Sequence, residues 1–481
     1  MEPPHHPHLR RTSVTVNTPT STPADRAPTR SQRLDVLPWT RKHTRLLSGS
    51  GIGWALDAMD VGLISFVLAQ LVVVWKTDAA QLSWVASAGF LGMAIGASLG
   101  GLLADRLGRR QVFALTLLVY GAATGVSALS WSVGALIALR FVVGLGLGAE
   151  LPIASTLVSE FAPARIRGRI IVILESFWAI GWTVTALIGF LVVPRGDDGW
   201  RWALAIGAVP AVWAIFVRLK LPESVRFLEL RGRHHEAEAI VRDFEDAAAA
   251  RTPAAGVTPA GASAHPAAAP LTEPDAADTA PTAAPRISAL FSTALRRRTI
   301  PLWIVWFCVN FAYYGAFIWL PTLLVAAGFP LVRSFEYTLI ITIAQLPGYA
   351  ASAWLVEKWG RRTTLAVFLA GSAVSAGLFA SAGEVWQILL FGSLLSFFNL
   401  GAWGALYAVT PELYPTRVRG TGAGWAAGFG RLASILAPLC VPLLSAAGGT
   451  ALPFAVFAGV FVIAAIAALA LPDLRGRALE D

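Results

Sequence analysis

Six ionisable side chains interrupt stretches of sequence that are otherwise almost entirely apolar. A charge in such a stretch is costly inside a hydrocarbon layer, so each residue marks a candidate site for protons or a polar ligand. The six residues are Asp57, Asp60, Arg140, Glu150, Glu175 and Arg431. Asp57 and Asp60 are three residues apart and therefore share one face of a helix. Because two neighbouring carboxylates in a low dielectric resist ionising together, this pair is a candidate for holding a proton near neutral pH.

The composition requires lipid to solvate much of the chain. Of 481 residues, 56% are hydrophobic and 14% are charged, which is more apolar surface than a soluble fold of this length buries. The net charge of +9 does not indicate nucleic-acid binding, because the arginines are dispersed among apolar segments and form no basic face. Cys308 and Cys440 lie inside apolar stretches, so we predict neither a disulfide framework nor a metal site.

Twelve apolar runs are long enough, at roughly 20 residues each, to span a bilayer. They begin near Leu47, Leu82, Val112, Val133, Ile170, Trp202, Ile300, Tyr337, Thr364, Val385, Thr421 and Leu452. These runs predict an all-α membrane protein with twelve transmembrane helices. Nearly all lysines and arginines then fall on one side of the membrane; the other side holds Lys76, Arg195, Arg201 and Arg333. We therefore expect an integral protein of the inner (plasma) membrane with both termini in the cytoplasm.

The domain organisation follows from changes in composition along the chain. We expect a disordered cytoplasmic tail (1–45), a six-helix bundle (46–221), a cytoplasmic linker (222–298), a second six-helix bundle (299–472) and a cytoplasmic tail (473–481). The linker should begin with short amphipathic helices and continue as a disordered Ala- and Pro-rich stretch. The apolar side of these helices is predicted to carry Phe227, Leu230, Ala237, Ile240, Val241 and Phe244. We assign no role to His5, His6 and His8, because histidines in such a tail are usually solvated.

Two motifs occur twice in the chain at one spacing. Leu-Ala-Asp-Arg-Leu-Gly-Arg-Arg at 103–110 recurs as Leu-Val-Glu-Lys-Trp-Gly-Arg-Arg at 355–362. Glu-Phe-Ala-Pro-Ala-Arg-Ile-Arg-Gly at 160–168 recurs as Glu-Leu-Tyr-Pro-Thr-Arg-Val-Arg-Gly at 412–420. Both pairs are offset by 252 residues (357 − 105 and 412 − 160). We therefore predict two pseudo-symmetric six-helix bundles, an arrangement in which one half moves against the other around a site near the midplane.

These motifs carry a resemblance to a known family. Gly-Gly-Leu-Leu-Ala-Asp-Arg-Leu-Gly-Arg-Arg at 100–110 resembles the loop motif of the major facilitator superfamily, and the likeness extends over about 47–471. Arg140, Glu160 and Arg167, with Pro-Glu-Ser-Val-Arg-Phe-Leu at 222–228, resemble the sugar-porter branch of that superfamily.

One stretch departs from the sugar porters. Where they carry Gln-Gln-Leu-Ser-Gly in helix seven, this chain has Trp-Phe-Cys-Val-Asn-Phe-Ala-Tyr-Tyr-Gly at 306–315. This stretch, Leu-Asp-Ala-Met-Asp at 56–60 and the residues at 414–425 together are most similar to bacterial niacin and aromatic-acid:proton symporters and to synaptic-vesicle transporter-like proteins.

The resemblance implies coupling to protons. Asp-Val-Gly-Leu-Ile-Ser at 60–65 is similar to the stretch that holds the coupling aspartate of proton-driven sugar symporters, whose partner arginine matches Arg140. Protonation of Asp60 would release Arg140 and tie proton movement to substrate movement. The alternative is a permanent pair that only holds helices one and four together. The residues assigned to proton coupling are Asp57, Asp60, Arg140, Glu150 and Glu175.

Helices seven and ten line the cavity in this superfamily, and their aromatic and amide groups are candidates for substrate contact. With one residue of helix eleven, the candidates are Asn310, Tyr313, Tyr314, Asn399, Trp403, Tyr407 and Arg431. A flat aromatic acid suits such a set, whereas the alternative role of the aromatic residues is packing and interfacial anchoring. Arg431 either binds an anionic substrate or pairs with Glu412 or a backbone carbonyl.

The charged residues of the repeated motifs are candidates for a cytoplasmic gate. A latch that closes the cytoplasmic side when the site faces outward is predicted from Asp105, Arg109, Glu160, Arg167, Glu357, Arg361, Glu412 and Arg419. The remaining charged motif residues, Arg106, Arg110, Lys358 and Arg362, are expected mainly to set the orientation of the chain in the membrane. Gly108, in the turn of the first motif, is also assigned to the gate. The alternative is that both motifs only set the orientation of the chain.

The expected function is secondary active transport by alternating access, with proton-coupled uptake of a small organic or aromatic carboxylate such as nicotinate. The alternatives are symport of a sugar, polyol or other metabolite, drug efflux, and a receptor that does not transport. An enzyme is not predicted, because no catalytic motif stands in a suitable context. We expect no cofactor and no nucleic-acid partner. The expected partners are a small-molecule substrate, protons and the lipid bilayer, and the expected functional unit is the monomer.

Overall fold

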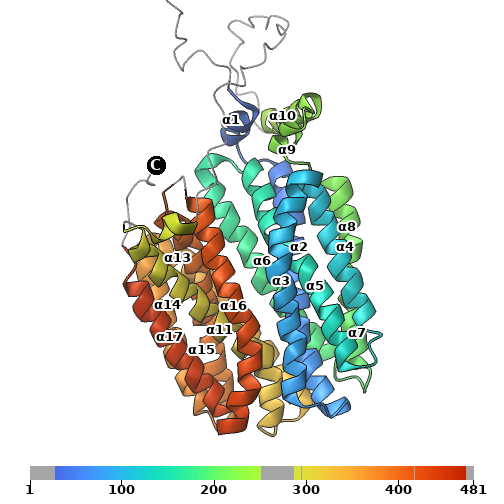
Figure 1. The fold of residues 1–481 in the computed structure, drawn as a ribbon, viewed down its shortest axis with the longest axis vertical. Helices are drawn as coiled ribbons and strands as arrows, with labels where there is room; N and C mark the ends of the chain where they lie inside the picture. Colours follow the sequence, from blue (N-terminus) through green and yellow to red (C-terminus); the bar gives the residue numbers. More distant parts are fainter. Residues whose placement is uncertain (1–27, 251–286, 294, 416–417, 473–481) are drawn as a thin grey trace, which may run out of the picture.

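Two bundles of long helices stand side by side (Figure 1). The computed structural model describes residues 28–250, 287–293, 295–415 and 418–472, and these residues contain helices and no strand. The first bundle consists of α2 (Arg41–Val74), α3 (Ala79–Leu107), α4 (Arg109–Ser127), α5 (Val133–Phe161), α6 (Arg167–Leu191), α7 (Gly199–Ile206) and α8 (Val209–Lys220). The second consists of α11 (Arg296–Ala326), α12 (Leu331–Ile343), α13 (Gln345–Trp359), α14 (Arg361–Ala380), α15 (Val385–Val409), α16 (Arg419–Gly448) and α17 (Ala451–Leu469). Short 3₁₀ turns occur at Ala164–Ile166, Ile287–Phe291 and Thr410–Leu413.

These helices form the twelve predicted membrane spans. Among the described residues, eleven helical segments are long and apolar enough to cross a membrane, and two of them are the broken pairs α7–α8 and α12–α13. The twelfth span is α4, which is less apolar because it begins with Arg-Arg-Gln but packs against α5 and α8 in the same bundle. Each helix starts at, or up to six residues before, the predicted apolar run (47 − 41 for α2). The all-α fold of two six-helix bundles is therefore confirmed.

The offset between the repeated motifs is also the offset between the two bundles. α4 starts at Arg109 and α14 at Arg361, and α6 starts at Arg167 and α16 at Arg419. Both pairs differ by 252 residues (361 − 109 and 419 − 167). The halves thus repeat one helical plan, as the sequence predicted.

Small residues allow the closest helix contact in the first bundle, between α3 and α5. A Cβ added at Gly144 would lie 2.0 Å from the carbonyl oxygen of Gly89, and one added at Gly148 would lie 2.0 Å from that of Met93. Any side chain at these positions would push the two backbones apart. Such contact between small residues is a main source of helix association in a bilayer, where apolar faces are not driven together by water.

The charges divide the molecule into two ends. We call the end at which Arg41, Arg109, Arg296 and Arg361 start their helices the basic end, and the opposite end the far end. By the order of the helices, the far end carries the four cations predicted there, which are Lys76, Arg195, Arg201 and Arg333. The bundle ends therefore show the charge asymmetry that orients membrane proteins.

The two halves touch from the midplane toward the far end. The ring of Phe66 in α2 lies 5.1 Å from the ring of Phe335 in α12. The Ser87 hydroxyl of α3 donates a hydrogen bond of 2.9 Å to the carbonyl oxygen of Ile435 in α16. These contacts close the far end of the interface between the bundles.

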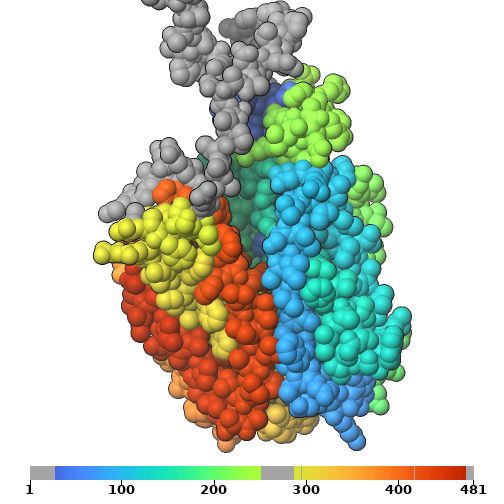
Figure 2. Space-filling model, in the orientation of Figure 1, coloured from blue at the N-terminus to red at the C-terminus, as the bar shows by residue number. Residues whose placement is uncertain are grey.

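Toward the basic end the halves separate. Among the described residues, one ion pair joins the bundles there, between Arg169 and Glu357 at 3.8 Å, and these side chains are 70% and 73% exposed. Figure 2 shows α16 and α3 in contact over the lower part of the visible face and apart toward the basic end, where deeper residues of the first half are visible between them. The structure is therefore a conformation open toward the basic end.

Three short helices cover the basic end of the first bundle. They are α1 (Arg30–Asp35), α9 (Val225–Leu230) and α10 (His234–Ala249). The predicted amphipathic helices are thus present, and Phe227, Ala237, Val241 and Phe244 are buried while Ile240 is half-buried. Leu230 was wrongly placed on the apolar side, because it ends α9 and is 82% exposed.

α1 was missed by the sequence analysis. Residues 28–45 were expected to be part of a disordered tail, but they contain α1 and the start of α2. α1 begins with a capping box in which Thr29 and Gln32 bond to each other's backbone amides, and its Leu34 is buried. The other predicted disordered stretches, at 1–27, 251–286 and 473–481, lie outside the described residues, as do His5, His6 and His8.

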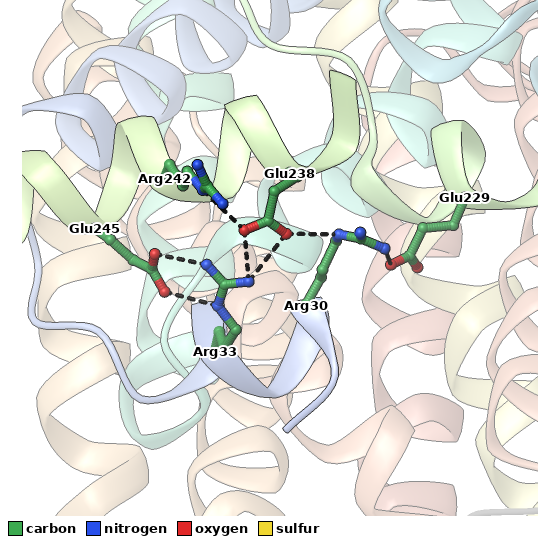
Figure 3. Close-up of polar contacts among 6 residues, drawn as sticks. All are labelled: Arg30, Arg33, Glu229, Glu238, Arg242 and Glu245. Carbon is green, nitrogen blue, oxygen red and sulfur yellow. Dashed lines mark hydrogen bonds and ion pairs between the residues drawn. The ribbon is translucent and has the colours of Figure 1, made fainter. Parts of the chain in front are cut away.

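α1 is fastened to α9 and α10 by a set of ion pairs that we call the α1 clasp (Figure 3). Arg33 binds Glu245 at 2.7 Å and Glu238 at 2.9 Å, and Arg30 binds Glu238 at 2.9 Å and Glu229 at 3.0 Å. Burial raises the pKa of Glu238, but hydrogen bonds from the arginines outweigh that effect and leave its pKa below the ordinary value. Several charge-assisted bonds in one network are stronger than isolated surface pairs.

The clasp yields the first prediction. Glu238→Gln removes the charge that Arg30 and Arg33 share, so α1 should detach more often, and its amides should exchange hydrogen roughly tenfold faster. Hydrogen–deuterium exchange of the peptide covering α1 measures this effect. The control is Glu236→Gln, which removes a carboxylate of the same helix that pairs with Arg233. Equal exchange in the two variants would contradict the assigned role of the clasp.

Candidate functional site

A buried ion pair lies inside the first bundle. The Asp60 Oδ2 of α2 is 2.9 Å from the Arg140 Nη2 of α5, and their side chains are 0% and 4% exposed. The other carboxylate oxygen of Asp60 accepts a hydrogen bond of 2.5 Å from the hydroxyl of Thr124 in α4. The predicted pairing of Asp60 with Arg140 is therefore present, and Thr124 is a third member that no sequence motif indicated.

Two further carboxyl groups lie beside this pair without such partners. Asp57 and Glu150 are both fully buried; no hydrogen-bond donor among the described residues reaches the oxygens of Asp57, while the Tyr120 hydroxyl of α4 is the neighbouring donor of Glu150. Glu150 packs against the backbone of α2, because a Cβ added at Gly53 would lie 2.9 Å from its Oε1. A dehydrated carboxylate without a cation beside it is strongly disfavoured, so these two groups are the natural places for exchangeable protons.

Arg431 faces the space between the halves from α16. It is half-buried, and its Nη1 donates a hydrogen bond of 3.4 Å to the hydroxyl of Tyr314. Glu412, one alternative partner considered from the sequence, instead binds Arg361 at 2.9 Å. Within the described part of the chain, no carboxylate lies within 4.0 Å of Arg431, although Glu175 and Asp57 are close enough to influence it electrostatically. The guanidinium group therefore remains able to bind an anion.

Aromatic rings of the second bundle gather beside Arg431. Tyr313 lies 5.0 Å from Tyr314 and 5.1 Å from Trp403, measured between ring centroids. Trp306 lies 5.1 Å from Tyr407 and 6.3 Å from Trp403. We call these five residues the aromatic layer. Four of them were predicted as substrate contacts, whereas Trp306 was missed.

The first bundle closes the aromatic layer from the other side. The Trp178 indole of α6 donates a hydrogen bond of 3.1 Å to the Tyr313 hydroxyl. Phe90 of α3 lies 4.5 Å from Tyr314, and Trp182 of α6 lies 5.7 Å from Tyr313. No local sequence signal distinguishes these three residues, because an aromatic side chain in an apolar helix is usually a packing residue.

The two predicted asparagines differ in what they offer a ligand. Asn310 is occupied, because its amide donates to the Trp306 carbonyl at 2.8 Å and accepts from the Ser434 hydroxyl at 3.0 Å. It therefore joins α11 to α16 in this conformation. Asn399 is buried and no described residue bonds to its amide, whereas the amide of Gln345, at the break between α12 and α13, lies beside the Tyr313 hydroxyl. A buried amide like that of Asn399 normally binds water or a ligand.

The gate residues of the first bundle bond within their own half. Arg109 pairs with Asp105 at 3.2 Å and approaches Glu160 to 4.0 Å, and Glu160 accepts a short hydrogen bond from Ser224. Arg167 binds Asp35 of the missed helix α1 and the carbonyl oxygen of residue 162. None of these contacts crosses to the second bundle, in keeping with a structure open at this end.

Gly108, Arg106 and Arg110 of the first motif contact the segment that follows α8. Gly108 has a φ of +101°, and a Cβ there would lie 2.5 Å from a carboxylate oxygen of Glu223. Glu223 also accepts the backbone amide of Arg110 at 3.1 Å. The Arg106 side chain is exposed, while its carbonyl oxygen accepts a hydrogen bond from Arg231 at 2.5 Å. Gly108 is therefore required by both its backbone conformation and its close packing.

The gate residues of the second bundle follow the same plan. Arg361 binds Glu412, and Arg419 donates to the Tyr414 carbonyl oxygen at 3.3 Å. Arg362 donates to the carbonyl oxygen of residue 469 at 2.5 Å. Lys358 lies over the ring of residue 354, with 4.6 Å between its Nζ and the centroid. The exception is Glu357, which contacts Arg169 of the other half, a partner that the motif comparison did not indicate.

Comparison with known proteins decides the family. Residues 49–481 match the family described as "Sugar (and other) transporter". The chain belongs to this family. It is accordingly an integral membrane transporter of the major facilitator superfamily and not an enzyme.

Individual relatives support this assignment. The chain is 44% identical over 451 residues to the niacin transporter NiaP of Acinetobacter baylyi, covering 93% of this chain and 98% of that protein. It is 42% identical over 433 residues to NiaP of Bacillus subtilis, covering 90% and 96% of the two chains. A synaptic vesicle 2-related protein of Xenopus laevis is 29% identical over 460 residues, covering 90% of this chain and 78% of that one. The predicted likeness to niacin and synaptic-vesicle transporter-like proteins is confirmed.

Solved structures show the same fold. The partially occluded inward open conformation of the xylose transporter XylE from E. coli matches with a TM-score of 0.68 at 18% identity, covering 88% of this chain and 98% of that one. Its inward open conformation also matches with a TM-score of 0.68. At this identity the likeness describes the arrangement of the helices alone.

The buried pair yields a prediction about stability. Arg140→Gln leaves the Asp60 carboxylate buried without its cation, so the variant should lose about 3–5 kcal/mol of stability. The double variant Asp60→Asn/Arg140→Gln removes both charges and should recover much of that loss. Thermal unfolding in detergent measures both effects. A double variant no more stable than Arg140→Gln would contradict the pairing.

Proposed function

We propose that this protein imports nicotinate, or a closely related aromatic carboxylate, together with protons. The observation that carries the proposal is Arg431, a half-buried guanidinium beside the aromatic layer, in a chain 44% identical to a niacin transporter. A guanidinium binds a carboxylate through two parallel hydrogen bonds, and flat rings stack on or edge against a pyridine. One small ligand would thus use both features.

The binding geometry also accounts for movement of the two halves. Arg431, Tyr313 and Trp403 belong to the second bundle, whereas Trp178 and Phe90 reach the same layer from the first. A ligand bound here would touch both bundles and favour the conformation in which both can hold it. Because both bundles belong to one chain, we propose that the monomer is the functional unit.

Proton coupling is assigned to the buried acids of the first bundle. Asp60 is held by Arg140 and Thr124, while Asp57 and Glu150 have no cation within ion-pair distance among the described residues. In the proposed cycle, a proton reaching Asp60 weakens its hold on Arg140, and Asp57 and Glu150 buffer the proton in the dry interior. Glu175, on α6 and close to Arg431, links this cluster to the anion site.

The orientation is part of the proposal. Among the residues that the structure describes, four lysines and arginines lie at the far end, so the basic end should face the cytoplasm, with both termini on that side of the plasma membrane. The structure then corresponds to a conformation open to the cytoplasm. In the outward-facing state, the charged motif residues of the two bundles would exchange partners across the interface and act as the proposed gate. In the first bundle these residues are Asp105, Arg109, Glu160 and Arg167, and in the second they are Glu357, Arg361, Glu412 and Arg419.

Transport by Arg431 variants tests the substrate assignment. In proteoliposomes, Arg431→Gln should lower nicotinate uptake about thirtyfold or more and leave the neutral analogue nicotinamide much less affected, because a carboxylate loses its charged partner. Arg431→Lys, which keeps the charge but not the paired hydrogen bonds, is the control and should fall between. Nicotinate uptake by Arg431→Gln at the wild-type rate would refute the proposed contact.

Transport by an Asp60 variant tests the coupling. Asp60→Asn should abolish accumulation of radiolabelled nicotinate driven by an inward proton gradient, because residue 60 no longer changes charge, while exchange of labelled for unlabelled substrate continues. The matched control is Asp197→Asn, a neutralised aspartate that is exposed at the far end. If Asp60→Asn accumulates nicotinate against its gradient as well as the control does, Asp60 does not couple transport to protons.

A further inference from the structure

A cavity at the basic end lies outside the transport site. It has a volume of about 280 Å³, is open to solvent on one side, and is lined by the starts of α2 and α4, the end of α8 and one face of α10. Ile240 and Phe244 of α10 form part of its wall. The cavity therefore exists only while α10 lies against the bundle, the position in which the α1 clasp holds it (Figure 3).

The lining of this cavity is predominantly cationic. Its charged side chains are Lys42, Arg45, Arg110, Lys220, Arg233, Glu223, Glu236 and Asp243. Five are cations and three are acids, which leaves a net charge of +2 (5 − 3). An anion bound there would meet several donors within one partly open pocket.

Two of the five cations are paired with acids of the lining. Lys42 is paired with Asp243, and Arg233 with Glu236 at 2.6 Å. Glu223 lies next to Arg110 and accepts its backbone amide.

No carboxylate of the described residues lies within ion-pair distance of Arg45, Lys220 or Arg110. The Arg110 guanidinium, however, donates to the carbonyl oxygen of Leu221 at 3.3 Å, whereas the side chains of Arg45 and Lys220 are exposed. These two cations are the groups that an incoming anion would neutralise.

The outer side of the cavity continues into a lipid-facing ridge. α8 lies on the flank of the first bundle, and Val212, Ile215 and Leu219 on one of its faces are 68%, 60% and 68% exposed (Figure 1). Their spacing of three and four residues keeps them on one side of the helix. Leu219 is directly followed by Lys220, so the ridge ends at the cationic cavity. Apolar surface for acyl chains and charge for a headgroup are thus adjacent.

We propose that this cavity binds the phosphate of an anionic phospholipid, with the acyl chains lying along the exposed face of α8. The phosphate oxygens bind Arg45 and Lys220, and Arg110 lies deeper in the same cavity. Basic pockets between membrane helices bind lipid headgroups in this manner. A soluble phosphate ester would satisfy the same cations, but it would leave the apolar ridge unused.

Thermal unfolding in nanodiscs tests the proposal. The wild type is compared in nanodiscs of phosphatidylcholine alone and of phosphatidylcholine with increasing phosphatidylglycerol, and separately with soluble glycerol 1-phosphate in the phosphatidylcholine nanodiscs. We expect stabilisation by phosphatidylglycerol that saturates, and none by glycerol phosphate at equal concentration. In Arg45→Gln/Lys220→Gln, half-maximal stabilisation should need about thirtyfold more phosphatidylglycerol.

The control variant removes the same charge from the same end. Arg41→Gln/Arg297→Gln neutralises two exposed cations at helix starts that do not line the cavity, and it should respond to phosphatidylglycerol like the wild type. Equal responses of the two double variants, or an unsaturable response of the wild type, would overturn the site. Stabilisation by glycerol phosphate that depends on Arg45 and Lys220 would show a soluble ligand and overturn the lipid assignment. Because all four residues are at the surface, both variants should unfold like the wild type in phosphatidylcholine alone.

Discussion

Burial of charge within a membrane-spanning bundle is the constraint that organises this protein. Asp60 and Arg140 are both almost completely removed from solvent, and their position is acceptable only because they lie 2.9 Å apart. That contact requires α2 and α5 to lie close together, and Thr124 adds α4. Arg431 also needs a partner for its charge, but it lies at the interface of the halves and has no carboxylate within 4.0 Å among the described residues. Asp60 and Arg140 are thus paired within the fold, whereas Arg431 has a tyrosine hydroxyl as its partner in this conformation.

The packing of the helices makes this arrangement possible. At the α3–α5 contact, Gly144 and Gly148 bring the backbones so close that no Cβ would fit. Rigid bundles of this kind allow the interface between them to open and close without disturbing the buried pair inside one of them. In this conformation the aromatic layer joins the halves near the midplane, through Trp178 and Tyr313, while the basic end is separated. Apart from Glu357, which contacts Arg169 of the first bundle, the residues of the repeated motifs accordingly bond within their own halves.

The sequence predicted the features that repeat or that have a strong local signal. The apolar runs located all twelve spans, since crossing a bilayer needs a length that no other local pattern provides. The motif offset predicted the two halves, and the likeness around Asp60 predicted its pairing with Arg140. Contacts between distant polar residues were not predictable in this way. Arg33 of α1 reaches Glu245 across 212 positions, and neither residue stands in a recognisable motif. Trp178, Trp182 and Trp306 were missed because aromatic residues in apolar helices usually serve packing alone.

The central claim is that the buried acids move protons when the ligand at Arg431 moves. The most direct measurement follows the internal pH of proteoliposomes after nicotinate is added outside at equal pH on both sides, with protein-free liposomes correcting for passive entry of the acid. The account predicts internal acidification in excess of the liposome control, saturating with nicotinate as labelled uptake saturates. Saturable nicotinate uptake without any excess proton entry would contradict it.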